Sequence, residues 1–594
     1  MLKNNPFLRL KRILTPSDFN SMLFILMILF ISGIFETLGI ASIIPFINIV
    51  ADENYQITNT YAVYVIDILS LNPTEAKILI GALVISLFVF INLFNIYSAH
   101  RTLYFVARIE HSISTRVMES CLLRPYQEHI EQSPSQLTKH ILEDAGALCS
   151  GIIYPLIQIV SKTLIIILIS VLLIIVDYKI FLSSFFIFSL IYFFIYKRFT
   201  KIAKEAGEQR VIINDDRYKT TRDVLDALKE VRFYSVENNY INKFSDHAKQ
   251  FSLVDAKINF FSVIPRYIIE IIVFGIIFSS ILIIIGTDSQ LKTYLPIIGV
   301  FIIAAYRAIP MLQNVYTNLN LFRFYQPIFG IIENLYRVKK INIDSRKQQE
   351  QLEFSDNIEF KDINFSHKDQ PKIITNLNCK IYHKSITALI GSTGSGKTSL
   401  IDILLGFYKP SSGTIFVDGN KLTEDLQNAF NNGIGYVTQS VNLQQNTIAE
   451  NIALGMPLEQ IDIDKVYEIL KVVELDSLIQ NLAEGIHTNI GDRGTKLSGG
   501  QRQRIGIARA LYSTPNILVF DESTNELDAA TETKILKNIR SYLPEITIIM
   551  ITHRLSSLKH ADRILLFSKN VLEDITIKNN QDIGYLEDII DINK

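Results

Sequence analysis

Tryptophan is absent from this chain of 594 residues, and cysteine is scarce. The three cysteines are Cys121, Cys149 and Cys379, and no two of them form a CxxC pair. The sequence therefore indicates neither a disulfide framework nor a zinc site. An excess of charge of one sign is also lacking, because the formal net charge is −1. This balance favours no nucleic-acid partner. Without tryptophan, anchoring at a membrane surface would depend on tyrosine, phenylalanine, lysine and arginine.

Long apolar runs are abundant, but they lie in the first half of the chain. Apolar residues make up 48% of the sequence and charged residues 20%. A helix that crosses a bilayer needs about 20 apolar residues. Runs of that length and number are typical of membrane helices rather than of buried helices in a soluble protein. The six candidate spans are residues 22–40, 78–97, 152–176, 180–196, 267–285 and 295–312.

The distribution of charge around these spans predicts their orientation. Residues 1–20 carry four lysines and arginines, whereas the loop 51–77 is mostly acidic. Basic residues beside membrane spans favour the cytoplasmic side, so the N-terminus is predicted to be cytoplasmic. Six spans then return the C-terminal part to the cytoplasm. We expect residues 1–20 to form an interfacial helix that leads into the membrane; a disordered basic tail is the alternative.

Three segments between the spans have predictable roles. Residues 100–150 and 197–259 carry mixed charge with helical periodicity and are too long for turns. We expect them to extend the neighbouring spans well into the cytoplasm. Residues 61–69 are apolar but too short to cross the membrane, so they predict either a helix at the outer surface or a packed helix within the loop.

The second half of the chain contains a motif that holds nucleotide phosphates. Residues 391–398 read GSTGSGKT and fit the pattern GxxxxGK[ST], with a strand-like run before them and a helix-like run after them. The glycines let backbone N–H groups turn toward phosphates, and the start of the helix adds to the attraction. Lys397 can reach the β- and γ-phosphates, and the Thr398 hydroxyl can bind Mg²⁺. An accidental glycine-rich loop is the alternative. The predicted ATP-binding residues of this stretch are Gly391, Ser392, Thr393, Gly394, Ser395, Gly396, Lys397, Thr398 and Ser399.

Further motifs follow in a specific order. Residues 497–501 read LSGGQ, an apolar strand-like run ends in Asp521 and Glu522, and His553 follows another such run. This order resembles the ATP-binding-cassette (ABC) ATPases, and the LSGGQ pentapeptide is complete. The resemblance covers the region from residue 355 to the C-terminus.

The resemblance implies a role for each of these positions. Asp521 would hold Mg²⁺ together with Thr398, and Glu522 would polarise the attacking water. Gln439 would sense Mg²⁺ and face the transport domain, and His553 would contact the γ-phosphate. Taken alone, the glutamine would be a surface residue, the histidine a core residue and the acidic pair a helix cap. The other implied ATP contacts are Ser498, Gly499, Gly500, Gln501 and Asp528.

Two positions depart from the family pattern. His367 stands where the family often has a tyrosine that stacks on adenine. An imidazole can also stack, and a solvent-facing loop histidine is the alternative. The loop that usually reads SALD here reads NELD at residues 525–528, a change that could alter communication between cassettes.

The chain as a whole resembles the exporter-type ABC architecture, in which long intracellular helices end in short coupling helices. By position these would fall at residues 124–132 and 226–232, with an ordinary solvated helix face as the alternative. The expected fold class is a membrane bundle of six transmembrane helices fused to a cytosolic α/β P-loop ATPase domain. The predicted divisions are 1–20, an interfacial segment; 21–330, the transmembrane domain; 331–354, a linker; and 355–594, the nucleotide-binding domain.

The resemblance also implies a dimer, because the signature motif of one cassette acts on the nucleotide of the other. Glu522 and the LSGGQ motif are intact, so a homodimer with two competent sites is the simplest expectation; a heterodimer is the alternative. ATP would close the cassettes and open the cavity outward, and hydrolysis would reset the cycle.

Charged residues inside the predicted spans are costly and are candidates for function. Glu36 lies in the first span, Arg266 and Glu270 at the start of the fifth, and Arg307 late in the sixth. Because a guanidinium matches phosphate oxygens, we take Arg266 and Arg307, with Glu36, as candidate substrate residues. The structural alternative pairs Arg266 with Glu270, four residues on, and Arg307 with Glu36.

Three short strings bear on the substrate. FETLGIA (35–41), IPRY (264–267) and AYRAIP (305–310) resemble the bacterial flippases of lipid-linked oligosaccharides, which are homodimeric exporters. The resemblance implies a lipid-linked glycan moved across a bacterial inner membrane, among membrane lipids. A general lipid, multidrug or peptide exporter is the alternative. The six spans argue against a soluble ABC ATPase of DNA repair or translation, and the fusion of spans and ATPase in one chain argues against an importer.

Overall fold

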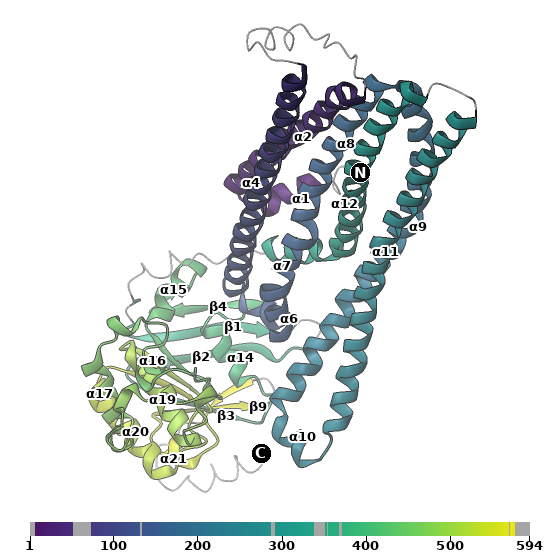
Figure 1. Ribbon diagram of the computed structural model, residues 1–594. Helices are drawn as coiled ribbons and strands as arrows, with labels where there is room; N and C mark the ends of the chain where they lie inside the picture. The colour runs from purple at the N-terminus through teal and green to yellow at the C-terminus, as the bar shows by residue number, and fades with distance from the viewer. Residues whose placement is uncertain are drawn as a thin grey trace. The chain divides into compact units, whose positions relative to one another are not determined.

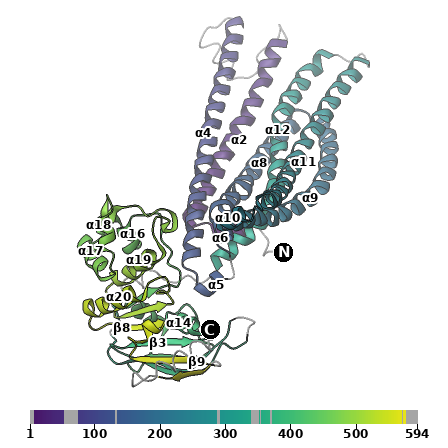
Figure 2. The same ribbon diagram turned by 90° about the horizontal axis from the view of Figure 1, so that it is seen from below.

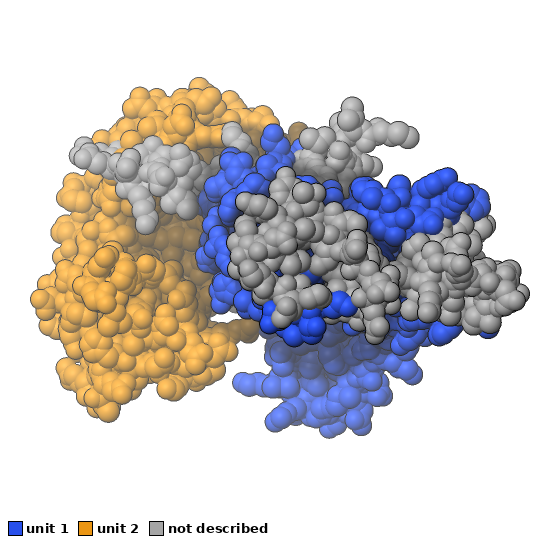
Figure 3. All heavy atoms as spheres, turned by 45° about the horizontal axis from the view of Figure 1, so that its top comes forward, with its two compact units in different colours: residues 1–124, 128–340 blue, residues 125–127, 341–594 orange. Residues whose placement is uncertain are grey.

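The computed structural model describes residues 6–51, 73–130, 133–286, 291–337, 351–352, 354–367, 371–568 and 571–575. The chain divides into two compact units, coloured separately in Figure 3. Unit 1 comprises Met1–Arg124 and Glu128–Lys340, and unit 2 comprises Pro125–Gln127 and Ile341–Lys594. Each unit has its own hydrophobic core.

Unit 1 is built from long helices, drawn in Figures 1 and 2. The long helices are α2 (Pro16–Ala51), α4 (Pro73–Leu122), α8 (Tyr154–Val176), α9 (Tyr178–Asp226), α11 (Glu237–Gly286) and α12 (Leu291–Arg337). Five of the six predicted spans fall wholly within them, and the span 152–176 begins two residues before α8, in a π-helical turn. Helix α2 packs with α4, α9 with α11, and α8 with α12. Among the described residues, three helical stretches are long and apolar enough to cross a membrane by length and composition: Pro16–Ile43, Lys77–Leu122 and Pro134–Val176.

The connections agree in part with the expectations. Helix α8 ends at Val176 and α9 begins at Tyr178, and the backbone N–H of Lys179 donates to the Asp177 carboxylate (2.9 Å). Short helices lie at both predicted coupling positions, α5 (Tyr126–Ile130) and α10 (Leu228–Phe233). The expected surface helix at 61–69 lies outside the described residues.

Helix α12 continues to Arg337, into the range assigned to the linker. Ile332 and Leu335 are 0% and 2% exposed in the core of unit 1. Burial of these side chains stabilises the helix beyond residue 331. The first helix, α1 (Pro6–Ile13), joins the same core through Leu10 and Ile13. Leu10 and Ile13 are therefore covered by protein, and the position of residues 1–20 at the membrane surface stays a prediction.

The helical run before α8 is irregular. It consists of α6 (Pro134–Lys139), a π-helical turn (His140–Asp144), α7 (Ala145–Leu148) and a second π-helical turn (Cys149–Ile153). A π-helical turn interrupts the regular backbone ladder and is often found at functional positions.

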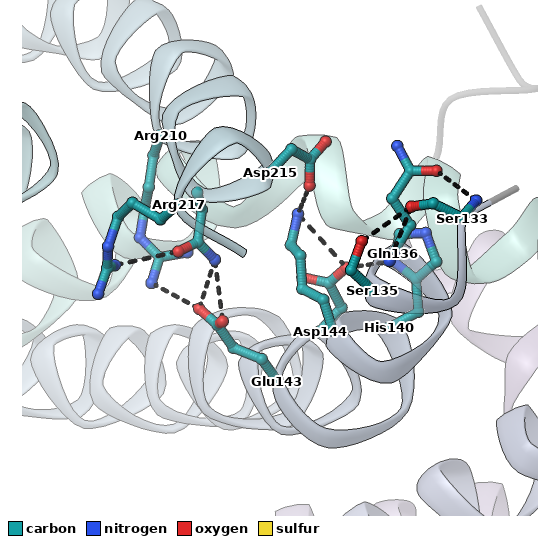
Figure 4. Close-up of polar contacts among 11 residues, drawn as sticks. Ser133, Ser135, Gln136, His140, Glu143, Asp144, Arg210, Asp215 and Arg217 are labelled. Carbon is teal, nitrogen blue, oxygen red and sulfur yellow. Dashed lines mark hydrogen bonds and ion pairs between the residues drawn. The ribbon is translucent and has the colours of Figure 1, made fainter. Parts of the chain in front are cut away.

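Polar side chains connect this irregular run to α9 (Figure 4). Lys139 is 1% exposed and forms ion pairs with Asp215 and, at 3.9 Å, with Asp144. The Asn214 amide donates to both oxygens of Glu143 (2.9 Å each). Pairing offsets part of the cost of removing these charges from water, and an unpaired charge at either position would be strongly destabilising.

Unit 2 contains two sheets covered by helices (Figures 1 and 2). An antiparallel sheet has the order β2-β1-β4-β5, and a second, largely parallel sheet has the order β10-β9-β3-β8-β7-β6. The strands are β1 (Asn357–Phe365), β2 (Ile374–Tyr382), β3 (Ile386–Gly391), β4 (Ser412–Val417), β5 (Asn420–Lys421), β6 (Ile434–Val437), β7 (Ile517–Asp521), β8 (Thr547–Ile551), β9 (Arg563–Ser568) and β10 (Val571–Asp574). Every residue of β3, β7 and β8 is buried, as expected of central strands with both faces covered.

The helices of unit 2 lie between its strands in the sequence. Their bounds are α14 (Lys397–Leu404), α15 (Glu424–Asn432), α16 (Ile448–Ile452), α17 (Ile463–Val472), α18 (Asp476–Gln480), α19 (Gly499–Tyr512), α20 (Ala529–Tyr542) and α21 (Leu555–Leu558).

Candidate functional site

The topology of the parallel sheet brings the predicted motifs to one edge. Strands β3, β6, β7 and β8 run parallel in this sheet. The phosphate loop follows β3, Gln439 follows β6, Asp521 ends β7 and His553 follows β8. Ligands of open α/β sheets bind beyond the carboxyl ends of the strands, and these residues lie at that edge.

The phosphate loop has the backbone that its glycines allow. Gly391, Gly394 and Gly396 have φ angles of +145°, +82° and +105°, a region that residues with a side chain rarely adopt. A Cβ at Gly391 would lie 2.5 Å from the Phe567 carbonyl oxygen. Only glycine therefore fits this close approach of the loop to β9.

Two side chains of the loop indicate that this site could bind an anionic ligand. The Lys397 ammonium donates to the carbonyls of Gly391 (2.7 Å) and Ser392 (2.9 Å), and burial lowers its pKa. The buried Ser395 hydroxyl has no hydrogen-bond partner among the described residues. Buried polar groups are normally paired, so this cradle suits phosphate oxygens.

Two predicted catalytic residues converge on the carboxylate of a third. The Gln439 amide donates to one oxygen of Glu522 (3.0 Å), and Nε2 of His553 lies 3.5 Å from the other. Glu522 has a φ angle of +48°, an uncommon backbone for a residue with a side chain and one that clusters at functional sites. The turn after β7 therefore holds this carboxylate in a defined direction.

Asp521 lies beside the phosphate loop. The Thr398 hydroxyl is 3.4 Å from Oδ1 of Asp521, and the phenol of Tyr436 donates to Oδ2 (3.3 Å). Burial raises the pKa of Asp521 above its ordinary value. Tyr436 was not among the sequence candidates. It stands three residues before Gln439, and its contact depends on strand pairing, which the sequence alone does not reveal.

The oxygens of this site fit Mg²⁺. Two ligands at neighbouring corners of an octahedral Mg²⁺ lie about 3 Å apart, since each bond is about 2.1 Å, and the Thr398 and Asp521 oxygens are 3.4 Å apart. In the part of the chain that the structure describes, no group of three or more His, Cys, Asp or Glu side chains could hold a metal ion. Magnesium here would therefore depend on few protein ligands and on phosphate oxygens.

The signature residues are engaged within their own chain. Ser498 caps α19: its hydroxyl accepts from the backbone N–H of Gln501 (3.3 Å), and its own N–H donates to the Gln501 side chain (2.8 Å). Asp528 caps α20 by accepting from the backbone N–H of Thr531 (2.9 Å). In the part of the chain that the structure describes, no hydrogen bond or ion pair joins Ser498, Gln501 or Asp528 to Glu522, whose side-chain partners are Gln439 and His553.

Glu526, one of the two departures from the family loop, lies against the signature helix. Its Oε2 is 1.9 Å from where a Cβ on Gly499 would be, and it lies 3.9 Å from the guanidinium of Arg502. The backbone N–H of Glu526 donates to the Gln503 side chain (2.9 Å). An acidic side chain thus covers the first residues of α19.

His367 belongs to a group of aromatic rings. Its ring centroid lies 5.0 Å from that of Phe365 and 5.1 Å from that of Tyr408. Adenine stacking by His367 stays a prediction. Tyr408 also faces Tyr126 of unit 2 (6.4 Å), a contact that no sequence pattern indicated.

The charged residues of the spans are paired. Arg266 donates to Glu270 (2.8 Å), and a guanidinium nitrogen of Arg307 lies 3.7 Å from Glu36. The Arg307 guanidinium is also 5.8 Å from the ring centroid of Phe88. These are the pairs of the structural alternative.

Taken together, the chain joins a domain of membrane-length helices to a P-loop ATPase domain. Comparisons with known proteins agree. The family model described as ABC transporter transmembrane region matches residues 18–305, and the model described as ABC transporter matches residues 374–525. The chain therefore belongs to the ABC transporters, as an exporter-type half-transporter with one membrane domain and one ATPase domain.

Two relatives extend the comparison. The chain is 41% identical over 221 residues to a leukotoxin translocation ATP-binding protein of Mannheimia haemolytica, and equally to one of Bibersteinia trehalosi. Each match covers 36% of this chain and spans only 30% of the length of the relative. A solved structure of a bacterial Atm1-family ABC exporter with ATP bound has a TM-score of 0.77 and 20% identity, over 97% of this chain and 98% of that one. This likeness supports the fold.

Proposed function

We propose that this protein is an ATP-driven exporter of a bacterial inner membrane, with its N-terminus and ATPase domain in the cytoplasm. The observation that carries the proposal is the convergence of Gln439 and His553 on Glu522, at the sheet edge that also holds the phosphate loop. Water attack on a γ-phosphate needs a group that orients the water beside a phosphate cradle, and this arrangement supplies one.

Each residue has a distinct part in the proposed reaction. The loop 391–399 binds and orients the phosphates. Thr398, Asp521 and Gln439 would hold Mg²⁺, which would neutralise phosphate charge. Glu522 orients the attacking water and accepts its proton, while His553 contacts the γ-phosphate. The second chain supplies Ser498, Gly499, Gly500 and Gln501. Support for a dimer comes from these signature residues, which begin a separate helix, α19, rather than joining Glu522 of their own chain.

The experiment that tests the proposed chemistry replaces His553 with Ala in the full chain. Turnover of ATP is expected to fall at least tenfold, because a transition-state contact is lost, while equilibrium binding of ATP is retained because the cradle is intact. His487→Ala, on the same unit but outside the site, is the matched control. Turnover equal to that of the wild type would contradict the role of His553.

For the cargo, we propose an amphipathic substrate with a phosphate-bearing head, a lipid-linked oligosaccharide in particular. The support is the sequence resemblance of the spans and the presence of Arg266 and Arg307 at their ends. Both guanidiniums pair with carboxylates, so a phosphate would have to exchange with Glu270 and Glu36. The names of the toxin-translocation relatives favour a protein or peptide cargo as the second candidate.

Proteoliposome assays separate the two cargo classes. If Arg266 and Arg307 bind phosphate, flipping of a fluorescent lipid-linked glycan is expected to be lost in the double Ala variant and partly kept in the double Lys variant, since Lys keeps the charge but loses the paired donors. Basal ATP turnover should survive in both. Full flipping by the double Ala variant, or transport of peptide alone, would contradict the glycan proposal.

A further inference from the structure

The carboxylate of Asp521 has two hydroxyl partners, and only one of them belongs to the phosphate loop. Thr398 contacts Oδ1, and the phenol of Tyr436 donates to Oδ2 at 3.3 Å. Hydrogen bonds to a metal-binding carboxylate orient it and strengthen metal affinity. The hydrogen bond from Tyr436 can therefore orient the carboxylate of Asp521.

The pairing of strands explains why Tyr436 reaches this carboxylate. In the parallel pair of β6 and β7, Tyr436 lies opposite Val519. Side chains two residues apart in a strand point to the same face, so Asp521 lies on the face of Val519 and Tyr436.

The ring of Tyr436 continues into a row of aromatic side chains. Its centroid lies 6.2 Å from that of Phe407, which in turn lies 5.0 Å from that of Tyr126. All three residues belong to unit 2. Tyr126 begins α5, and the transmembrane helix α4 ends at Leu122, four residues earlier in the chain. Within unit 2, the row thus leads from Tyr126 to the carboxylate of Asp521.

We propose that Tyr436 is a positioning residue for Asp521, and that the row Tyr126–Phe407–Tyr436, which lies within unit 2, sets the position of its phenol. This inference rests on the proposed ATPase function and deepens it. Tyr126 is 48% exposed, whereas Phe407 and Tyr436 are partly buried. Neighbouring rings restrict one another because side chains in contact leave little free space. A shift of Tyr126 would move Phe407 and then the phenol, and so change the direction of Asp521. The route is separate from Gln439, which contacts Glu522 instead.

Tyr436→Phe tests the first half of the inference, because it keeps the ring and removes only the hydroxyl. The measurement is equilibrium binding of ATP by the full chain, with Mg²⁺ varied and with Mg²⁺ removed by chelation. The Mg²⁺ concentration at half-saturation is expected to rise about 10-fold or more, while binding without Mg²⁺ is unchanged. Tyr467→Phe, which removes an exposed phenol on α17, is the control. An unchanged Mg²⁺ dependence in Tyr436→Phe would overturn the positioning role.

A double-mutant cycle tests the second half. Phe407→Leu and Tyr126→Ala are each expected to shift the Mg²⁺ dependence in the same direction as Tyr436→Phe, whereas Tyr126→Phe is expected to be neutral. If the row acts as one path, combining Phe407→Leu with Tyr436→Phe adds little to the single effect, because coupled residues are not additive. If the two substitutions instead multiply their separate effects on the Mg²⁺ dependence, the three rings do not act as one path.

The same measurements separate this inference from the proposed function. Wild-type protein that binds ATP but does not hydrolyse it would contradict the ATPase proposal. The change in Mg²⁺ dependence caused by Tyr436→Phe could still be measured from ATP binding. Wild-type protein that hydrolyses ATP, with no shift in Tyr436→Phe, would contradict the inference alone. Should Tyr436→Phe not yield folded protein, Phe407→Leu provides the same comparison.

Discussion

Among single residues, the carboxylates of the site differ in burial and in their hydrogen-bond partners. Glu522 accepts a hydrogen bond from Gln439 and has a left-handed backbone, whereas Asp521 is buried between two hydroxyls. A third carboxylate, Asp402 of α14, lies near Asp521, and its burial, with the neighbouring charge of Asp521, raises its pKa from 3.8 to about 6.

The raised pKa of Asp402 predicts how stability depends on pH. Because the folded pKa lies above the unfolded value, the folded protein binds the proton more tightly. Stability therefore falls as pH rises from about 4 to about 6, and the penalty is fully present above that range. Asp402→Asn removes the penalty. We expect a gain of about 1 kcal/mol in the free energy of unfolding at pH 7.5, after allowance for solvent screening.

Thermal unfolding of the full chain without nucleotide or Mg²⁺ measures this gain. It should shrink as the pH is lowered toward 5, because Asp402 in the wild type then takes up its proton. Asp425→Asn, at an exposed position at the start of α15, is the control. A variant that is no more stable than the wild type at pH 7.5 would show that the Asp402 carboxylate carries no penalty.

At the scale of elements, the loop before α20 meets the start of α19. The Glu526 carboxylate covers Gly499 and lies near Arg502. Negative charge is favourable at a helix N-terminus. In the proposed dimer the γ-phosphate of the partner's nucleotide would approach the same place, so the carboxylate and the phosphate would compete.

Glu526→Ala is therefore expected to lower the ATP concentration that gives half-maximal turnover. A charge at a helix N-terminus contributes about 0.3–1 kcal/mol, which corresponds to roughly a two- to fivefold change. Glu526→Gln should have a smaller effect in the same direction, and high salt should reduce the difference because it screens charge. A higher ATP requirement in Glu526→Ala would mean that the carboxylate assists closure instead.

The helices of unit 1 show what local patterns cannot reveal. The predicted spans were found because apolar runs of this length are typical of helices that cross a bilayer. The continuation of α12 to Arg337 was missed, since Ile332 and Leu335 are buried in a core that includes α1, a contact far away in the sequence.

Ser498 and Gln501 fit the sequence signature of a capping box, and the structure shows that box. Their predicted contact with a phosphate stays a proposal.

At the scale of the whole molecule, the fold class followed from the motifs and spans, whereas the detail of the site did not. The order of motifs implied which residues share the sheet edge, because parallel strands end at one edge. Tyr436 could not be found in this way, since its contact depends on the register of β6 with β7. The pairing of Arg266 with Glu270 was readable from their spacing of four.

We propose that Glu522 drives ATP hydrolysis in a membrane exporter. The measurement that tests it most directly compares ATP binding and ATP turnover by the wild-type protein and Glu522→Gln, both reconstituted in lipid. The glutamine keeps the size of the side chain but removes its negative charge, and it leaves the phosphate loop untouched. We predict that Glu522→Gln binds ATP as tightly as the wild type, accumulates as an ATP-bound dimer and has almost no turnover. Turnover close to that of the wild type would contradict the account.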